Sequence, residues 1–136
     1  MTDSERKGAR PGIVLFGHGA RDPQWAAPMQ RVAARIGEQA PGMAVSLAFM
    51  EFMTPTLDEA VDRLVAQGVT EVRIVPVFLA QGGHLKRDVP LAVAQAAQRH
   101  PMLSVSLATA AGEADAVVDA IAAYALTGIG LPKQKG

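Results

Sequence analysis

Two glycine-flanked histidines are the residues of this sequence best suited to binding a metal ion. His18 lies between two glycines, and His84 follows Gly82 and Gly83. Neutral imidazole is a common ligand for metal ions, and adjacent glycines let the backbone turn sharply and leave space for a large flat ligand. Because the sequence has no cysteine, any metal ion must be held by nitrogen and oxygen ligands from His, Asp or Glu.

A carboxylate and a set of basic residues complete the candidate site. Glu51 follows the second predicted strand, where it could act as a metal ligand or as a base, or instead pair with a surface Lys or Arg. Basic residues near the histidines would suit substrate carboxylates, although such residues are often only solvated. We predict His18, His84 and Glu51 as metal ligands and catalytic groups. The predicted substrate-binding residues are Arg21, Gly82, Gly83, Lys86 and Arg87.

Four apolar runs that alternate with helical patterns predict an α/β fold with a four-stranded parallel sheet and helices on both faces. The strands are expected at residues 12–16, 45–49, 72–79 and 103–108. The first and third runs are almost continuously apolar, which is typical of central strands, so the predicted strand order is 2-1-3-4. Pro76 should cause a bulge or a local irregularity, because proline cannot donate a ladder hydrogen bond.

Four helices are expected between and after these strands. The first presents a core face at helical spacing: Trp25, Met29, Val32, Ala33 and Ile36. The second begins after Thr56, which has capping-box spacing to Glu59, and ends at Gly68. The third is Ala-rich and covers residues 90–99. The fourth is expected to close the fold with one apolar face: Val117, Val118, Ile121, Ala122 and Ala125.

The predicted topology brings the chemically interesting residues to one edge of the sheet. In open parallel sheets, ligands bind beyond the carboxyl ends of the strands, near the point where the strand order reverses. Neighbouring strands lie about 4.8 Å apart and metal–imidazole bonds measure about 2.0–2.1 Å, so His18 and His84, on two expected loops, can share one ion. Individually, His18 could simply satisfy hydrogen bonds at a strand end and His84 could be solvated. Two such loops and a carboxylate at one edge favour a functional site.

Length and charge restrict the remaining possibilities. The 136 residues predict one domain at 12–126, between flexible segments at 1–11 and 127–136. Thirteen basic and 13 acidic residues balance, which argues against nucleic acid or an anionic membrane as partner. No apolar run suits a signal peptide or a membrane span, so a cytoplasmic location is expected.

His100 is not expected to be a catalytic residue. It lies at a predicted helix end, where an imidazole interacts favourably with the helix dipole and needs no catalytic explanation.

Three motifs, in this order, resemble one known family. They are GHGARDP at 17–23, AFMEFMTPTL at 48–57 and PVFLAQGGHLKRDVP at 76–90. Together they resemble the short, single-domain CbiX-type sirohydrochlorin chelatases, over roughly residues 12–125. Many relatives have Ser where this chain has Ala20, which questions a hydroxyl role at that position but not metal binding.

The resemblance implies a class II chelatase fold and the insertion of cobalt or ferrous iron into sirohydrochlorin, in cobalamin or siroheme biosynthesis. It places the two family histidines on His18 and His84 and the carboxylate on Glu51. It also implies a homodimer in place of the two lobes of longer relatives. The divalent metal (Co²⁺, Fe²⁺ or Ni²⁺) is a substrate, and no organic cofactor or iron–sulfur cluster is expected.

Two other classes of function remain open at this point. A carrier could bind the metal or the tetrapyrrole and deliver it without catalysing insertion. Steady turnover would distinguish a chelatase from such a carrier. A histidine phosphotransferase is less compatible, because Gly17 stands where the usual Arg-His-Gly motif has arginine.

Overall fold

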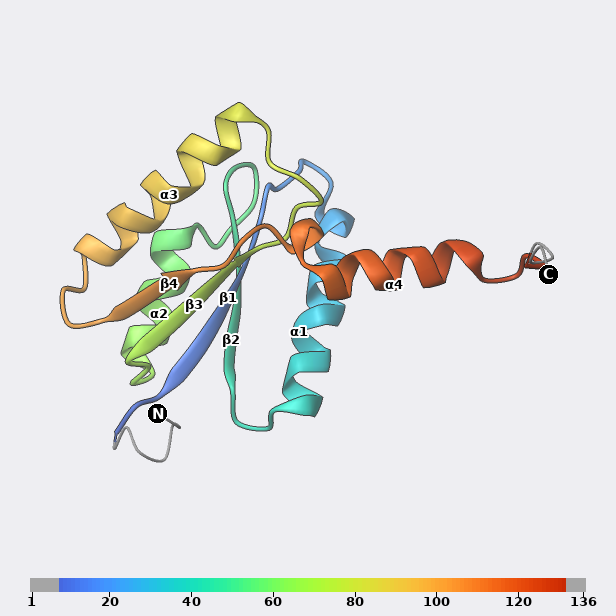
Figure 1. Cartoon of the computed structure of the whole chain (residues 1–136). Coiled ribbons are helices and arrows are strands. Elements are labelled where there is room, and N and C mark those ends of the chain that lie inside the picture. The colour runs from blue at the N-terminus through green and yellow to red at the C-terminus, as the bar shows by residue number, and fades with distance from the viewer. Residues whose placement is uncertain (1–7, 132–136) are drawn as a thin grey trace.

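The four predicted strands form one parallel sheet in the computed structural model, which describes residues 8–131 (Figure 1). The strand order is β2-β1-β3-β4, as predicted, and all three pairings are parallel. The strands are β1 (Pro11–Gly17), β2 (Ala44–Phe49), β3 (Glu71–Pro76) and β4 (Ser104–Leu107). Of the terminal segments predicted to be flexible, residues 1–7 and 132–136 lie outside the described part.

The expected bulge at Pro76 is wrong, because β3 ends there. Pro76 is in register with Phe16 of β1, and the pairing is one-to-one along both strands. The next residue, Val77, donates its backbone N–H to the Phe16 carbonyl oxygen at 2.9 Å. A proline at the last strand position avoids the ladder defect that it would cause in the middle of a strand.

Helices cover both faces of the sheet. On one face, α1 (Ala27–Gln39), preceded by the short 3₁₀ helix η1 (Pro23–Ala26), packs on β1 and β2. On the other face lie α2 (Leu57–Ala66) and α3 (Gly83–Gln98). Side chains alternate across a strand, so β1 supplies Val14 and Phe16 to one core and Leu15 to the other.

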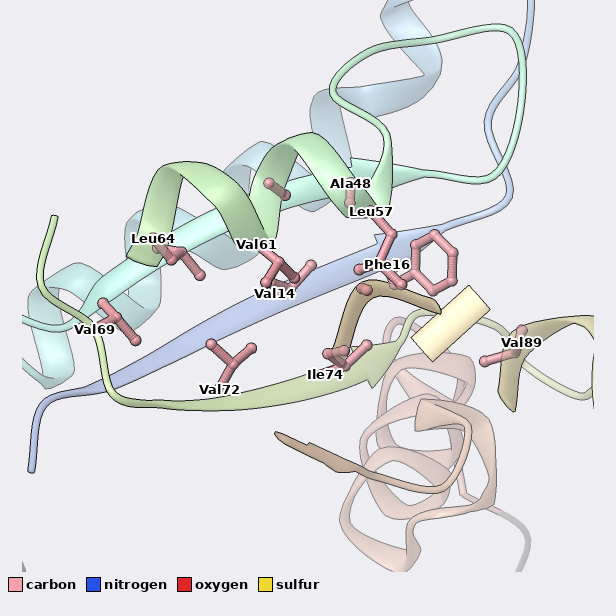
Figure 2. Close-up of a cluster of buried hydrophobic side chains, with 12 residues drawn as sticks. Val14, Phe16, Ala48, Leu57, Val61, Leu64, Val69, Val72, Ile74 and Val89 are labelled. Carbon is pink, nitrogen blue, oxygen red and sulfur yellow. The ribbon is translucent and has the colours of Figure 1, made fainter. Parts of the chain in front are cut away.

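The α2 helix follows directly from its sequence. The Thr56 hydroxyl accepts a hydrogen bond from the Glu59 backbone N–H at 3.2 Å, and the Glu59 carboxylate accepts one from the Thr56 N–H at 2.9 Å. This is the predicted capping box. Leu57, Val61 and Leu64 are buried and belong to the same cluster as Val14 and Phe16 of β1 (Figure 2). The helix ends at Ala66, and Gly68 then turns the chain with a φ of +91°.

Two helix predictions need correction. The α3 helix begins at Gly83, seven residues before the expected start, and contains Pro90. Proline is a frequent first residue of helices, which is why the sequence favoured a start there. In the first helical segment Met29 is buried, whereas Trp25 and Val32 are 47% and 43% exposed, so they do not belong to the core face.

The fourth helix does not close the fold as expected. The α4 helix (Asp115–Leu126) follows the short 3₁₀ helix η2 (Ala111–Glu113) and extends away from the sheet (Figure 1). None of its residues is buried. Its residues other than Asp115 and Asp119 are apolar or aromatic, so apolar side chains lie around most of the helix, and nothing else in residues 8–131 covers the predicted face. No helix in this range has the combination of length and apolar character that a membrane crossing requires.

Candidate metal site

The carboxyl ends of β1, β2 and β3 meet at one edge of the sheet because the strands are parallel (Figure 1). His18 is the first residue after β1, and Glu51 is the second after β2. His84 lies in the first turn of α3, not in a loop as expected. Lys86 and Arg87, also predicted in that loop, belong to the same helix.

Backbone hydrogen bonds hold the loops after β1 and β2 together. Met50 donates its N–H to the Gly17 carbonyl oxygen at 3.0 Å, and Glu51 donates to the His18 carbonyl oxygen at 3.2 Å. Gly19 has a φ of +93°, and a Cβ atom on it would collide with the Glu51 carbonyl oxygen. Only glycine combines this backbone conformation with this close approach. The sequence therefore fixes the relative position of His18 and Glu51 through backbone contacts.

His18 and Glu51 direct their side chains toward each other. The His18 Nε2 lies 3.4 Å from the Glu51 Oε1, and the two side chains are 47% and 50% exposed. The pair combines one imidazole nitrogen and one carboxylate oxygen, which are both metal ligands and both proton acceptors. The exposure leaves room for an ion and for a large ligand in front of the pair.

His84 does not join this pair. Its Nδ1 lies 3.4 Å from Arg87 Nη2. Within residues 8–131, no three His, Asp or Glu side chains gather closely enough to hold a metal ion together. A Cβ atom on Gly82 or Gly83 would meet nothing within 4 Å, so the segment leading to His84 is surrounded by open space. The structure thus brings together two of the three predicted ligands.

The predicted basic residues have other contacts. Arg87 also approaches its neighbour Asp88, with Nε 3.7 Å from Oδ1. The guanidinium carbon of Arg21 lies 4.8 Å from the centre of the Phe52 ring. Sequence reasoning did not single out Phe52. Its only sequence signal is its position directly after Glu51.

His100 has a structural role, in line with the expectation that it needs no catalytic explanation. Its Nε2 lies 2.6 Å from Asp62 Oδ1, and the Arg99 Nη2 donates to Asp62 Oδ2 at 2.6 Å. Hydrogen bonds from Arg99 and then from His100 lower the pKa of the Asp62 carboxyl, and the same pairing raises the pKa of Arg99. These contacts connect α2 to the end of α3.

Two sizeable hollows of the surface lie away from the candidate site. They have volumes of about 440 Å³ each. One is at the amino ends of β1, β3 and β4, and the other lies beside His100. The histidine–glutamate pair is therefore on an open surface rather than inside either of these cavities.

Solved structures similar to this chain include a CbiX protein and sirohydrochlorin chelatases. A CbiX protein from Marinobacter aquaeolei VT8 matches with a TM-score of 0.75 and 31% identity, over 85% of this chain and 93% of that one. The sirohydrochlorin chelatase SirB from Bacillus subtilis subspecies spizizenii, in complex with cobalt, matches with a TM-score of 0.72 and 26% identity. That match covers 84% of this chain but only 49% of SirB. The fold is thus that of the chelatases, as predicted.

The chain belongs to the CbiX family, whose model matches residues 12–126. This confirms the resemblance indicated by the three motifs. Sirohydrochlorin cobaltochelatases from Methanococcus aeolicus and Methanopyrus kandleri are each 41% identical over 78 residues, which is 57% of this chain and 54% of each relative. The aligned part therefore spans about half the length of these curated relatives.

Proposed function

We propose that this protein is a chelatase, a lyase that inserts Co²⁺ or Fe²⁺ into sirohydrochlorin, within cobalamin or siroheme biosynthesis. The curated relatives are named sirohydrochlorin cobaltochelatases. One SirB structure contains cobalt, and another, with a TM-score of 0.75 and 25% identity over 90% of this chain, contains Fe³⁺. Divalent metal is the substrate, Ni²⁺ is a further candidate, and no organic cofactor is required.

The distance between His18 and Glu51 carries this proposal. Two ligand atoms at about 2.1 Å from an ion, with a tetrahedral angle between the bonds, lie about 3.4 Å apart. The His18 Nε2 and the Glu51 Oε1 are 3.4 Å apart. The pair is therefore preorganised to accept an ion with little movement. Because the side chains are half exposed, the ion can keep water ligands until the macrocycle replaces them.

His84 is proposed as the third ligand, recruited from the first turn of α3. The open space around Gly82 and Gly83 allows the short segment before the helix to adjust. Once the ion is bound, its charge also disfavours the approach of Arg87 to the His84 imidazole. Metal binding would thus exchange an Arg87 contact for a coordination bond.

The same residues can manage the protons of the reaction. A divalent ion that enters the macrocycle replaces two pyrrole protons. The imidazole of His18 and the carboxylate of Glu51 lie where they could accept these protons as the ion leaves them. A basic group that releases the metal becomes free to take a proton, so coordination and proton transfer are coupled. Arg21, Lys86 and Arg87 are the proposed contacts for substrate carboxylates.

An absorbance assay with sirohydrochlorin and Co²⁺ or Fe²⁺ tests the proposal. We expect multiple turnovers by the native chain, and a loss of at least about 100-fold in His18→Ala and Glu51→Gln. His84→Ala should weaken metal binding by about 10- to 100-fold. His100→Ala is the matched control, because it removes a histidine that pairs with Asp62, outside the proposed ligand set. Binding of metal or tetrapyrrole without rate enhancement would instead support a carrier.

We also propose that a second copy of the chain completes the substrate site. This chain aligns with only 49% of the cobalt-bound SirB, so two copies would match the size of that protein. The α4 helix offers an interface, since Val118, Ile121 and Tyr124 are 49%, 47% and 81% exposed. Burial of such a face contributes about 25 cal/mol per Å² of apolar surface. A partner copy whose own α4 is equally uncovered can bury both helices in a symmetric contact.

Light scattering after size exclusion tests the dimer. We expect twice the 14.2 kDa mass of one chain, and a shift toward the single-chain mass in Ile121→Glu. Met102→Glu is the control, because Met102 is 96% exposed on the turn before β4. A native chain that stays at the single-chain mass at assay concentrations would refute the proposal.

The single domain at 12–126 and the cytoplasmic location remain predictions, which limited proteolysis and cell fractionation would test.

A further inference from the structure

Phe52 adopts an unusual backbone conformation directly after Glu51. Its φ is +68°, and it is the only non-glycine residue with positive φ among residues 8–131. Bulky residues rarely adopt this left-handed region, because Cβ lies too close to the following carbonyl oxygen. The ring is also 57% exposed, so the strain is not compensated by burial in a core. Strain of this kind is concentrated at functional sites.

The position of Phe52 relates it to the metal-binding pair. It directly follows Glu51, whose carboxylate faces His18. The Arg21 guanidinium carbon lies 4.8 Å from the ring centre, so an arginine from the loop after β1 covers one face of the ring. A guanidinium stacks on an aromatic face in the same manner as a flat conjugated molecule. Phe52 therefore presents an exposed aromatic side chain on the residue that follows a proposed metal ligand.

We propose that Phe52 stacks on the face of the tetrapyrrole and that Arg21 then exchanges the ring for a substrate carboxylate. This inference rests on the proposed chelatase function and adds a substrate-binding residue to it. In this exchange each group that loses a partner gains another. The macrocycle replaces the guanidinium on the ring, and the substrate carboxylate replaces the ring as the partner of Arg21. Exposed cation–π contacts contribute only about 0.5–1 kcal/mol, so the initial contact is readily released.

Substitutions at one position can separate the ring from its strained backbone. Asn tolerates the left-handed region, so Phe52→Asn keeps the backbone and removes the ring, whereas Phe52→Tyr keeps the ring. Phe52→Leu keeps an apolar side chain but no aromatic face. Each variant is titrated with metal-free sirohydrochlorin, followed by the tetrapyrrole fluorescence, and separately with Co²⁺ alone. Melting temperatures report whether the variants fold.

Stacking predicts that Phe52→Asn binds metal-free sirohydrochlorin about tenfold more weakly than the native chain. The affinity of Phe52→Leu for sirohydrochlorin should lie between these two values, and that of Phe52→Tyr should be within about twofold of the native affinity. The affinity for Co²⁺ alone should change by less than about twofold in all three, because the ring does not touch the ion. The melting temperature of Phe52→Asn should be unchanged or higher, since the strain is relieved.

Arg21→Gln provides an independent signature. This variant should bind sirohydrochlorin more weakly than the native chain, and the difference in affinity should shrink as salt is added, because salt screens a charge pair. The difference between Phe52→Asn and the native chain should persist at high salt. A folded Phe52→Asn that binds sirohydrochlorin as tightly as the native chain would overturn the stacking role and leave the chelatase proposal intact. A native chain that binds sirohydrochlorin through Phe52 but does not turn over would instead contradict the chelatase proposal alone.

Discussion

Replacement of Gly19 by alanine should misplace the His18–Glu51 pair without touching either side chain. Gly19 has a φ of +93°, a conformation that costs an alanine about 1–2 kcal/mol. The added Cβ would also lie closer than 3.0 Å to the Glu51 carbonyl oxygen, and ordinary van der Waals contact begins at 3.4 Å. The loops after β1 and β2 must therefore separate by more than 0.4 Å, the difference between these two limits. This separation would weaken the hydrogen bond from the Glu51 N–H to His18.

The expected magnitude follows from these two effects. The backbone strain should lower the melting temperature by roughly 4–8 °C, at about 4 °C per kcal/mol for a chain of this length. A displacement of about 1 Å at a catalytic centre can cost about 100-fold in rate. We therefore expect kcat/KM to fall by about 10- to 100-fold, measured by the absorbance of metal insertion and by competitive Co²⁺ titration.

Gly37→Ala is the matched control for this substitution. Gly37 lies in α1, its φ is not positive, and a Cβ on it would meet nothing within 4 Å. The same chemical change should therefore raise stability, by about 0.5–1 kcal/mol, and leave activity unchanged. A Gly19→Ala variant with native metal affinity and turnover would refute the idea that this close contact sets the geometry of the site.

Three further substitutions test how the fold is stabilised. Thr56→Ala should cost about 1 kcal/mol in urea unfolding, because the capping box is lost, whereas Thr56→Ser should retain most of it. Leu64→Ala should cost about 2–5 kcal/mol, since Leu64 is 1% exposed in the core, and a cost below about 1 kcal/mol would contradict that packing. Asp62→Asn should destabilise the protein at neutral pH, because the folded carboxyl has a pKa below its ordinary 3.8 and its stabilisation is present above that value. The difference between Asp62→Asn and the native chain should shrink as the pH falls below about 4, and a difference independent of pH would exclude the Arg99 pairing as its source.

The sheet could be predicted from the sequence because its physical signals are local and strong. Two almost continuous apolar runs indicated strands covered on both faces, and together with right-handed crossovers they placed β1 and β3 at the centre. The capping box at Thr56 and Glu59 located the start of α2 for the same reason. Pro90 misled the prediction of α3, because proline marks both helix starts and helix interruptions. The apolar sequence of α4 carried no information on what covers the helix.

The geometry of the candidate site could be predicted in part for related reasons. His18 and Glu51 were expected at one edge because each follows one of two adjacent parallel strands, and their side chains lie 3.4 Å apart. The expected loop at His84 is the first turn of a helix, since Gly82 and Gly83 obscured the helix start. Phe52 escaped notice because nothing in a sequence marks a phenylalanine for positive φ.

A crystal structure of the Co²⁺-loaded native chain, with anomalous scattering measured at the cobalt edge, tests the central claim most directly. The account predicts an anomalous peak about 2.0–2.2 Å from His18 Nε2 and Glu51 Oε1, with a His84 nitrogen as a third ligand. A cobalt ion bound only elsewhere, for instance at His100 and Asp62, with the edge of the sheet unoccupied at saturating Co²⁺, would contradict it.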